Sequence, residues 1–465
     1  MQRTSTARIY LAAPVVALCL VQFVDVMGVT SVVTAIPAML DGVGAGDSLA
    51  SPVATAYAMF FGGLLVLGAR LGRKYGHRRM LLAGLGLLVA ASVIGALATA
   101  GWQLVAARSL QGTASALSVP SAMSLLLFAA PGMEARGQAL ALWSAAGATA
   151  GATGFLVGGV LTDLFGWPAV FWVTVPVGLL LAFGITRFVT AEPDPDPGLA
   201  LDVPGAVLLT VSVMAVVLGA SFLERSSTRL IGIALVAAGA IGIVLLIIWL
   251  RRAREPIIPL AALRQRRLSI GATGSFVNTA TTSSAGVLLT LYLQREKGLS
   301  PFKVGLMLLP ISFGAIAGST AAAPLMSRYS RRLVIGAGLC LIAAGNLMAA
   351  FALGSTVGIV VAMVALGLGI GLSSVGCNDI GTDVPEEHES TAIGLLNTAA
   401  QLGTALGVAA LVLLSSLDLV GRRSGTFVGL TAAATLALLT AIALMQWIPA
   451  TKPATRKMVR ERGYL

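Results

Sequence analysis

Two charged side chains lie inside long apolar stretches of this sequence, and they are the residues best suited to chemistry. Asp25 lies near the middle of an apolar run from 11 to 40, and a bilayer-spanning helix needs about 20 such residues. A charge at that depth costs roughly 2.5–3.5 kcal/mol on insertion scales, so it must face protein or water and indicates a functional site. Asp25 is predicted to bind and release a proton as the protein moves. The structural alternative is an acid that pairs with a neighbour and locks two helices.

Arg108 is the matching base. It lies with Gln111 in the apolar stretch 103–129, and residues three apart share one face of a helix. The cation would favour an ionised Asp25, whereas burial would favour the neutral acid, so the pair is predicted to couple protons to movement. The alternative role for Arg108 is to bind backbone carbonyls. The other polar side chains in apolar stretches are expected to line a substrate site: Gln22, Tyr57, Gln111, Asn278, Asn397 and Gln401.

The composition restricts the class of protein. The chain has 465 residues, of which 57% are hydrophobic and 11% charged, and its mean hydropathy is +0.91. A soluble domain could not bury that much apolar surface, so a polytopic membrane protein is expected. The formal charge of +12 lies mainly in loops between apolar stretches, which is the positive-inside pattern and predicts no nucleic-acid partner. Three cysteines without metal-ligand spacing predict neither a metal site nor a bound cofactor.

The apolar runs predict an all-α protein with about 14 transmembrane helices. Proline-rich or basic linkers follow the sixth and the eighth run, at 191–198 and 251–267. The expected domains are an N-terminal six-helix bundle (1–195), a linker with two additional transmembrane helices (196–255) and a C-terminal six-helix bundle (256–465). An even number of spans places both termini on the basic, cytoplasmic side of the cell membrane. Five basic residues are exceptions, because they fall on the outer side: Arg295, Lys297, Lys303, Arg422 and Arg423.

The fifth apolar stretch carries glycines at helical spacing: Gly147, Gly151, Gly154 and Gly158. They share one face, where small residues let two helix backbones approach. Static association of helices would produce the same pattern, and it is the commoner reason for it.

The chain resembles the major facilitator superfamily, in particular its fourteen-span drug/proton antiporter branch. The residues that carry the resemblance are Asp25 through Pro37, Arg108 with Gln111 and Gly112, the glycine face just described, the stretch from Ile393 to Gly407, and a loop motif formed by Arg70, Gly72, Gly76 and Arg78. The resemblance implies two six-helix bundles that alternate between inward-open and outward-open forms, with the loop motif and the glycine face as gating elements. Two positions depart from the family's pattern: Arg73 stands where an Asp is usual, and Phe155 where a Pro is usual.

Arg73 makes the loop after the second span wholly basic, whereas the segment before the thirteenth span is acidic, with Asp383, Glu386 and Glu387. The resemblance implies that these loops approach each other when the protein closes toward the cytoplasm. A latch between Arg73 or Lys74 and these acids is therefore predicted. The alternative is that both loops are solvated.

These features together predict a secondary transporter and not an enzyme, because no nucleophile–base or metal constellation is visible. The expected function is proton-coupled export of hydrophobic drugs, antibiotics or related small molecules, driven by the proton gradient. The transporter is expected to be a monomer in contact with membrane lipid. The alternatives are a dedicated exporter of one natural product or lipid, and a membrane sensor on the same fold that transports nothing.

Overall fold

The apolar runs form long helices. The computed structural model describes residues 13–130, 133–190, 195–196, 198–223, 226–254, 256–258, 262, 265–384, 386–416 and 425–448. Thirteen segments within these ranges are helices long and apolar enough to cross a membrane. A further 26-residue helix, α12 (Arg266–Leu291), is less apolar because of its Thr and Ser side chains. All fourteen predicted spans are therefore helical, and the regular structure in these ranges contains no strand.

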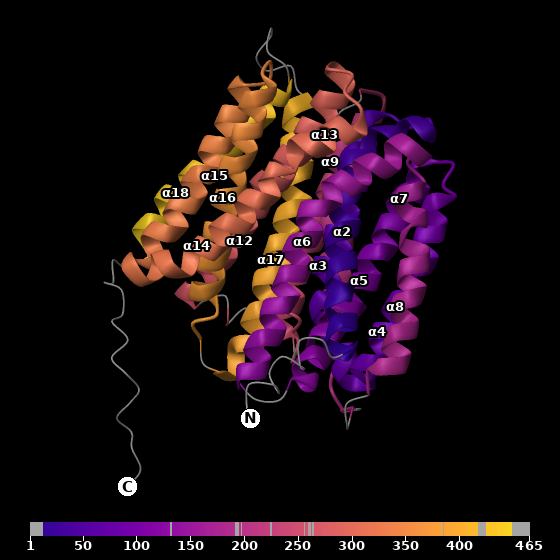
Figure 1. Cartoon of the computed structure of the whole chain (residues 1–465), viewed down its shortest axis with the longest axis vertical. Helices are drawn as coiled ribbons and strands as arrows, with labels where there is room; N and C mark the ends of the chain where they lie inside the picture. The colour runs from indigo at the N-terminus through magenta and orange to yellow at the C-terminus, as the bar shows by residue number, and fades with distance from the viewer. Residues whose placement is uncertain are drawn as a thin grey trace, which may run out of the picture.

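The spans before residue 190 form the first bundle, coloured indigo to purple in Figure 1. Their bounds are α2 Ala13–Gly42, α3 Ala50–Tyr75, α4 His77–Ala96, α5 Gly101–Ala129, α6 Met133–Phe165, and the pair α7 Ala169–Trp172 and α8 Thr174–Phe188. Gly76 joins α3 to α4 at a φ of 96°, a conformation that glycine adopts without a steric penalty. The tight reversal keeps the basic residues on either side of Gly76 on one face of the protein.

The second bundle, orange and yellow in Figure 1, begins with α12. It continues with η3 Tyr292–Glu296, α13 Pro301–Leu308, α14 Pro310–Arg328, α15 Arg331–Phe351, α16 Thr356–Gly381, α17 Glu386–Ser416 and α18 Gly425–Trp447. Side chains of Ser300, Ser330 and Ser355 accept hydrogen bonds from backbone N–H groups at the starts of α13, α15 and α16. These caps fix where each of the three helices begins.

Two helices lie between the bundles in sequence, α9 (Val203–Leu223) and α10 (Arg229–Arg252). One apolar cluster unites Met59 of α3, Leu209 and Val213 of α9, and Ala405 and Ala409 of α17. Helix α9 therefore packs against both bundles and covers the line where α3 meets α17. Helix α10 packs mainly on α9.

Asp202, just before α9, holds this helix pair together. Its carboxylate accepts hydrogen bonds from Trp249 Nε1 at 2.8 Å, from the backbone N–H of Ile257 at 2.7 Å and from that of Gly205 at 2.9 Å. Asp202 is buried, so these three donors compensate for the loss of hydration around its charge. The start of α9, the end of α10 and the following linker are thereby fixed to one another.

The same pair is tied to the first bundle through the end of α3. Arg70 donates to the carbonyl of Pro256 at 3.1 Å, and Lys74 donates to the carbonyl of Leu199 at 2.9 Å. The carbonyl of Arg73 accepts from the N–H of Asp196 at 2.9 Å. Both linkers therefore contact α3, which ties α9 and α10 to the first bundle.

One end of the molecule carries the basic residues of 70–79, 251–254 and 328–332, and we call it the basic face. The opposite face carries residues 41–49 and 292–300.

Candidate functional site

Asp25, Tyr57 and Arg108 come together from α2, α3 and α5. The Tyr57 hydroxyl donates a hydrogen bond to the Asp25 carboxylate, and the guanidinium carbon of Arg108 lies 4.8 Å from the centre of the Tyr57 ring. The side chain of Ser115 also hydrogen-bonds to Asp25. Asp25 and Arg108 make no direct ion pair, since Tyr57 lies between them and contacts both. Asp25 is only partly buried, whereas Tyr57 and Arg108 are buried.

Arg108 is fixed by groups other than the acid. Its Nη1 donates to the carbonyl of Gly28 at 3.3 Å and to Gln111 Oε1 at 2.9 Å. Gln111 Nε2 in turn donates to Ser92 Oγ at 3.0 Å. Arg108 thus binds a backbone carbonyl, as the structural alternative required, and also supplies a positive charge to the Asp25 cluster. Its side chain is 1% exposed, so the charge acts in a low-dielectric environment.

The polar residues predicted to line a substrate site lie in different surroundings. Tyr57 and Gln111 belong to the Asp25 cluster. Asn278 is buried inside the second bundle, where its Nδ2 donates to Ser373 Oγ at 2.8 Å and to Ser374 Oγ at 2.9 Å. Gln22 remains partly exposed on α2, and its Oε1 has no hydrogen-bond partner.

Asn397 and Gln401 lie on α17. Asn397 is exposed, and within the described part of the chain its side chain donates only to the carbonyl of Ile393 in its own helix. Helical spacing places Asn397 on the side of α17 away from Leu402, Leu406 and Ala409, which pack with α9. Asn397 therefore points between the two bundles. Gln401 contacts α3 at Gly62. The role of all six lining candidates in substrate binding stays a prediction.

The glycine face of α6 lies against α2. A Cβ at Gly154 would collide with Thr30, and one at Gly158 would collide with the backbone of Ser31. At Gly147 and Gly151 the nearest atoms are the side chains of Gln22 and Val26, at 3.2 and 3.8 Å. The two backbones are therefore closest toward the opposite face, and α6 is a continuous helix through Phe155. This arrangement explains the glycines as helix contacts, and their gating role stays a prediction.

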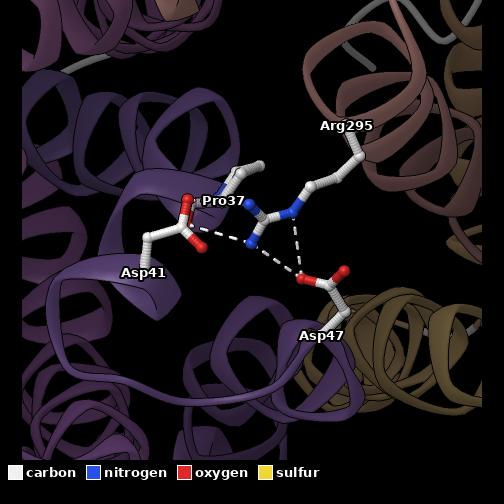
Figure 2. A network of polar contacts seen from close by, with 4 residues as sticks. All are labelled: Pro37, Asp41, Asp47 and Arg295. Carbon is white, nitrogen blue, oxygen red and sulfur yellow. Dashed lines mark hydrogen bonds and ion pairs between the residues drawn. The ribbon is translucent and has the colours of Figure 1, made fainter. Parts of the chain in front are cut away.

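On the opposite face, Arg295 of η3 joins the two bundles. Figure 2 shows its guanidinium between Asp41 and Asp47, at 2.7 Å from Asp41 Oδ2 and 2.8 Å from Asp47 Oδ1. The hydrogen bond to Asp41 raises the pKa of Arg295 above its ordinary value, so this side chain stays protonated across the physiological range. Beside it, Gln294 Nε2 donates to the carbonyl of Thr34 at 2.7 Å. We call Arg295, Asp41 and Asp47 the Arg295 latch. It links the two bundles at the opposite face.

Sequence reasoning did not find the Arg295 latch. The available signal was Arg295 itself, a cation on the side that the positive-inside pattern leaves poor in charge. Its partners lie 248 and 254 residues away in sequence, so their pairing depends on how the bundles meet.

The latch predicted at the basic face is not formed between those of its residues that the structure describes: neither Arg73 nor Lys74 contacts Asp383. Asp383 binds Arg267 at 2.8 Å and Arg331 at 2.7 Å, both within the second bundle. Lys74 binds the carbonyl of Leu199, and the side chain of Arg73 is exposed. The side chains of Glu386 and Glu387 lie outside the described residues. Such a latch belongs to a form closed at the basic face, and it stays a prediction.

The other residues of the loop motif have structural contacts. Arg78 donates to the carbonyl of Thr186 at the end of α8, at 2.7 Å. Gly72 is buried, and a Cβ there would collide with His77. With Arg70 on Pro256, the motif connects α3, α4, α8 and the linkers.

The fold and the buried charge cluster define a helical membrane transporter of two bundles. The sequence model of the Major Facilitator Superfamily matches residues 18–408 and 271–462, so the chain belongs to that superfamily, as the motifs predicted.

Several export and resistance proteins resemble the chain over most of their length. The chain is 30% identical to the cephamycin export protein of Amycolatopsis lactamdurans, covering 88% of this chain and 85% of that protein. It is 31% identical to the puromycin resistance protein of Streptomyces alboniger, covering 84% and 79%. It is 30% identical to the multidrug efflux pump LfrA of Mycolicibacterium smegmatis, covering 76% and 71%.

Solved structures share the fold. A POT family transporter in complex with 5-aminolevulinic acid has a TM-score of 0.67 at 14% identity, covering 93% of this chain and 95% of that one. The human organic anion transporter MFSD10 has a TM-score of 0.61 at 15% identity, covering 93% and 99%.

Proposed function

We propose that this protein exports hydrophobic drugs or antibiotics and that protons drive the export through Asp25. The observation that carries the proposal is the carboxylate of Asp25, a partly buried residue, which accepts the Tyr57 hydrogen bond close to the fixed charge of Arg108. The export and resistance proteins named above support the class of substrate.

The mechanism uses the two forms of the transporter. Protonation removes the negative charge that accepts the Tyr57 hydrogen bond, while Arg108 keeps its bonds to Gly28 and Gln111. The contact between α2 and α3 then loses a charged acceptor, and the relative stability of the two forms changes. Protons that enter from outside and leave inside drive the substrate outward.

The basic face is assigned to the cytoplasm by the positive-inside rule, which puts both termini there. The Arg295 latch then closes the extracellular side, and the form described here is the one ready to accept a substrate from inside. The protein works as a monomer in the cell membrane, with the proton gradient as its only energy source and without a bound cofactor.

The test is export by purified protein in proteoliposomes. A pH gradient is imposed, candidate compounds are screened in cationic, neutral and anionic sets, and the movement of protons is recorded with a pH-sensitive dye. Substrate-dependent proton movement is expected. Export that moves no protons would contradict the proposed proton coupling. Export of a single compound would favour a dedicated exporter.

A further inference from the structure

An apolar groove runs along the first bundle between α2 and α8. Its lining residues in the described part of the chain all come from these two helices, and every one of them is apolar or a glycine. On α2 they follow one helix face from Ala13 to Met27, and on α8 they extend from Val177 to Phe188. Several of them are exposed, Leu180 most of all, so the groove is open to the surroundings of the bundle.

The groove exists because α8 packs more closely on α4 than on α2. A Cβ at Gly178 would collide with Val89 of α4, at 2.7 Å. A Cβ at Gly184, which lies on the side of α8 toward α2, would meet only Ala17, at 4.0 Å. The side of α8 that faces α2 is therefore loosely packed, and space remains between the two helices.

The groove has the depth of one membrane leaflet. Ala13 is the first residue of α2, at the basic face, and Met27 lies 14 residues further along the helix, which corresponds to about 21 Å. The hydrocarbon core of a bilayer is about 30 Å thick, so one leaflet contributes roughly half of that. A long apolar groove of this depth fits an extended acyl chain better than a compact solute.

Two arginines lie at the end of the groove near the basic face. The guanidinium carbon of Arg187 is 5.8 Å from the centre of the ring of Phe188, which lines the groove there. Arg78, at the start of α4, donates to the carbonyl of Thr186 at 2.7 Å. Neither arginine forms an ion pair with an acid among the described residues. Guanidinium groups bind phosphate strongly, so the charge at this end complements an anionic headgroup.

We propose that the groove binds one acyl chain of an anionic phospholipid, whose phosphate lies at Arg187 and Arg78. The chain before α2 is a poorer occupant, because it carries Arg3 and Arg8, and like charges repel at an end that already holds two arginines. The bound acyl chain fills the space between α2 and α8 and supports the helix that carries Asp25. Binding at this surface does not depend on whether the protein exports drugs.

The test compares two neighbouring leucines of α8 at nearly the same depth. Leu180 lines the groove and is 69% exposed, whereas Leu179 lies outside the groove and is 57% exposed. Each is changed to cysteine in a chain whose Cys19, Cys340 and Cys377 are replaced by alanine, and is labelled with bimane. The labelled protein is reconstituted in phosphatidylcholine that contains increasing fractions of either phosphatidylglycerol or phosphatidylcholine brominated in its acyl chains.

We expect Leu180→Cys to be half-quenched at a several-fold lower fraction of brominated phosphatidylglycerol than of brominated phosphatidylcholine. Leu179→Cys is expected to respond equally to the two lipids. One cation near the membrane surface strengthens the binding of an anionic lipid about fivefold, so Arg187→Gln should reduce the preference at position 180 by about that factor. Arg252→Gln is the matched control, because this exposed arginine lies at the same face on α10.

Three results would overturn the lipid site. Equal half-quenching fractions for the two lipids at position 180 would mean that no anionic headgroup is selected. A preference that persists unchanged in Arg187→Gln would mean that the headgroup is bound elsewhere. Weaker quenching at position 180 than at position 179 with both lipids would show that protein, such as a second copy of the chain, fills the groove.

A second measurement uses the protein without a label in the groove. A ligand that binds only the folded state raises the melting temperature. Added phosphatidylglycerol is therefore expected to raise the melting temperature of the detergent-purified wild type more than phosphatidylcholine does. This difference should shrink in Arg187→Gln and persist in Arg252→Gln. Equal differences in the two variants would contradict a site at Arg187.

Discussion

Tyr57 donates a hydrogen bond to Asp25 and at the same time lies against the guanidinium of Arg108, so one phenol connects the acid of α2 with the base of α5. The acid and the base influence each other through this side chain and not through an ion pair. A change at Asp25 therefore alters the contact between α2 and α3 first. Arg108 is held separately by Gly28 and Gln111 and remains in place.

Asp25→Asn is expected to abolish export driven by a pH gradient and to leave the protein inserted and folded. Asn has nearly the same shape as Asp, accepts the Tyr57 hydrogen bond and cannot ionise. Efflux is measured under an imposed gradient, with the elution profile of the purified variant as the control for folding. Wild-type efflux in this variant would leave Asp25 as a structural residue.

Tyr57→Phe keeps the ring beside Arg108 and removes the hydroxyl. A hydrogen bond to a charged group contributes about 1.5–3 kcal/mol, so gradient-driven export is expected to fall roughly tenfold or more and its pH profile to shift. Tyr75→Phe is the control, because this tyrosine is exposed at the basic end of α3. An unchanged pH profile in Tyr57→Phe would exclude Tyr57 from proton coupling.

Arg295→Glu is expected to open the opposite face. The change removes two ion pairs and places a third negative charge beside Asp41 and Asp47. Exposed pairs contribute about 0–1 kcal/mol each, so alkylation of a Thr34→Cys reporter from that side should accelerate by roughly tenfold.

Thr34 is fully buried under this latch. Restoring a pair with Asp47→Arg in the same chain should slow the alkylation again. A rate that does not respond to either change would mean that the Arg295 latch has no part in closing this face.

Asp202→Ala is expected to lower the thermal stability of the purified protein. It leaves the N–H groups of Gly205, Trp249 and Ile257 without their acceptor, at a cost of about 2–5 kcal/mol. Asp196→Ala is the matched control, since that carboxylate is exposed and, among the described residues, accepts only from Gly198. Equal melting temperatures would show that the clamp does not stabilise the pair α9 and α10.

The sequence predicted much of this fold. Hydrophobic runs located all fourteen spans. A chain that crosses lipid must satisfy its backbone hydrogen bonds internally, as a helix does, so each long apolar run in the sequence corresponds to one helix. The spacing of Gly147, Gly151, Gly154 and Gly158 correctly indicated a close helix contact. Asp25 and Arg108 were identified because charges inside apolar runs are costly.

Contacts between distant segments were beyond such reasoning. Tyr57 was expected beside substrate, and only the approach of α2 to α3 puts its hydroxyl on Asp25. Asn278 was also predicted to line the substrate site, and the sequence did not show that its amide binds Ser373 and Ser374 on α16. The position of α9 against α17 could not be read from two apolar runs that look alike, since either run could have faced lipid on all sides.

The clamp at Asp202 also sets an order of assembly. The carboxylate of Asp202 can accept from Ile257 only after that residue, 55 positions later in the chain, has been synthesised. Both residues precede the first helix of the second bundle. During synthesis the N-terminal part of a chain folds first. The side of the first bundle covered by α9 can therefore be complete before α17 exists, and α17 is then inserted against a preformed surface. Substitutions that loosen the clamp should for this reason reduce the yield of inserted protein during biosynthesis, even where the finished molecule tolerates them.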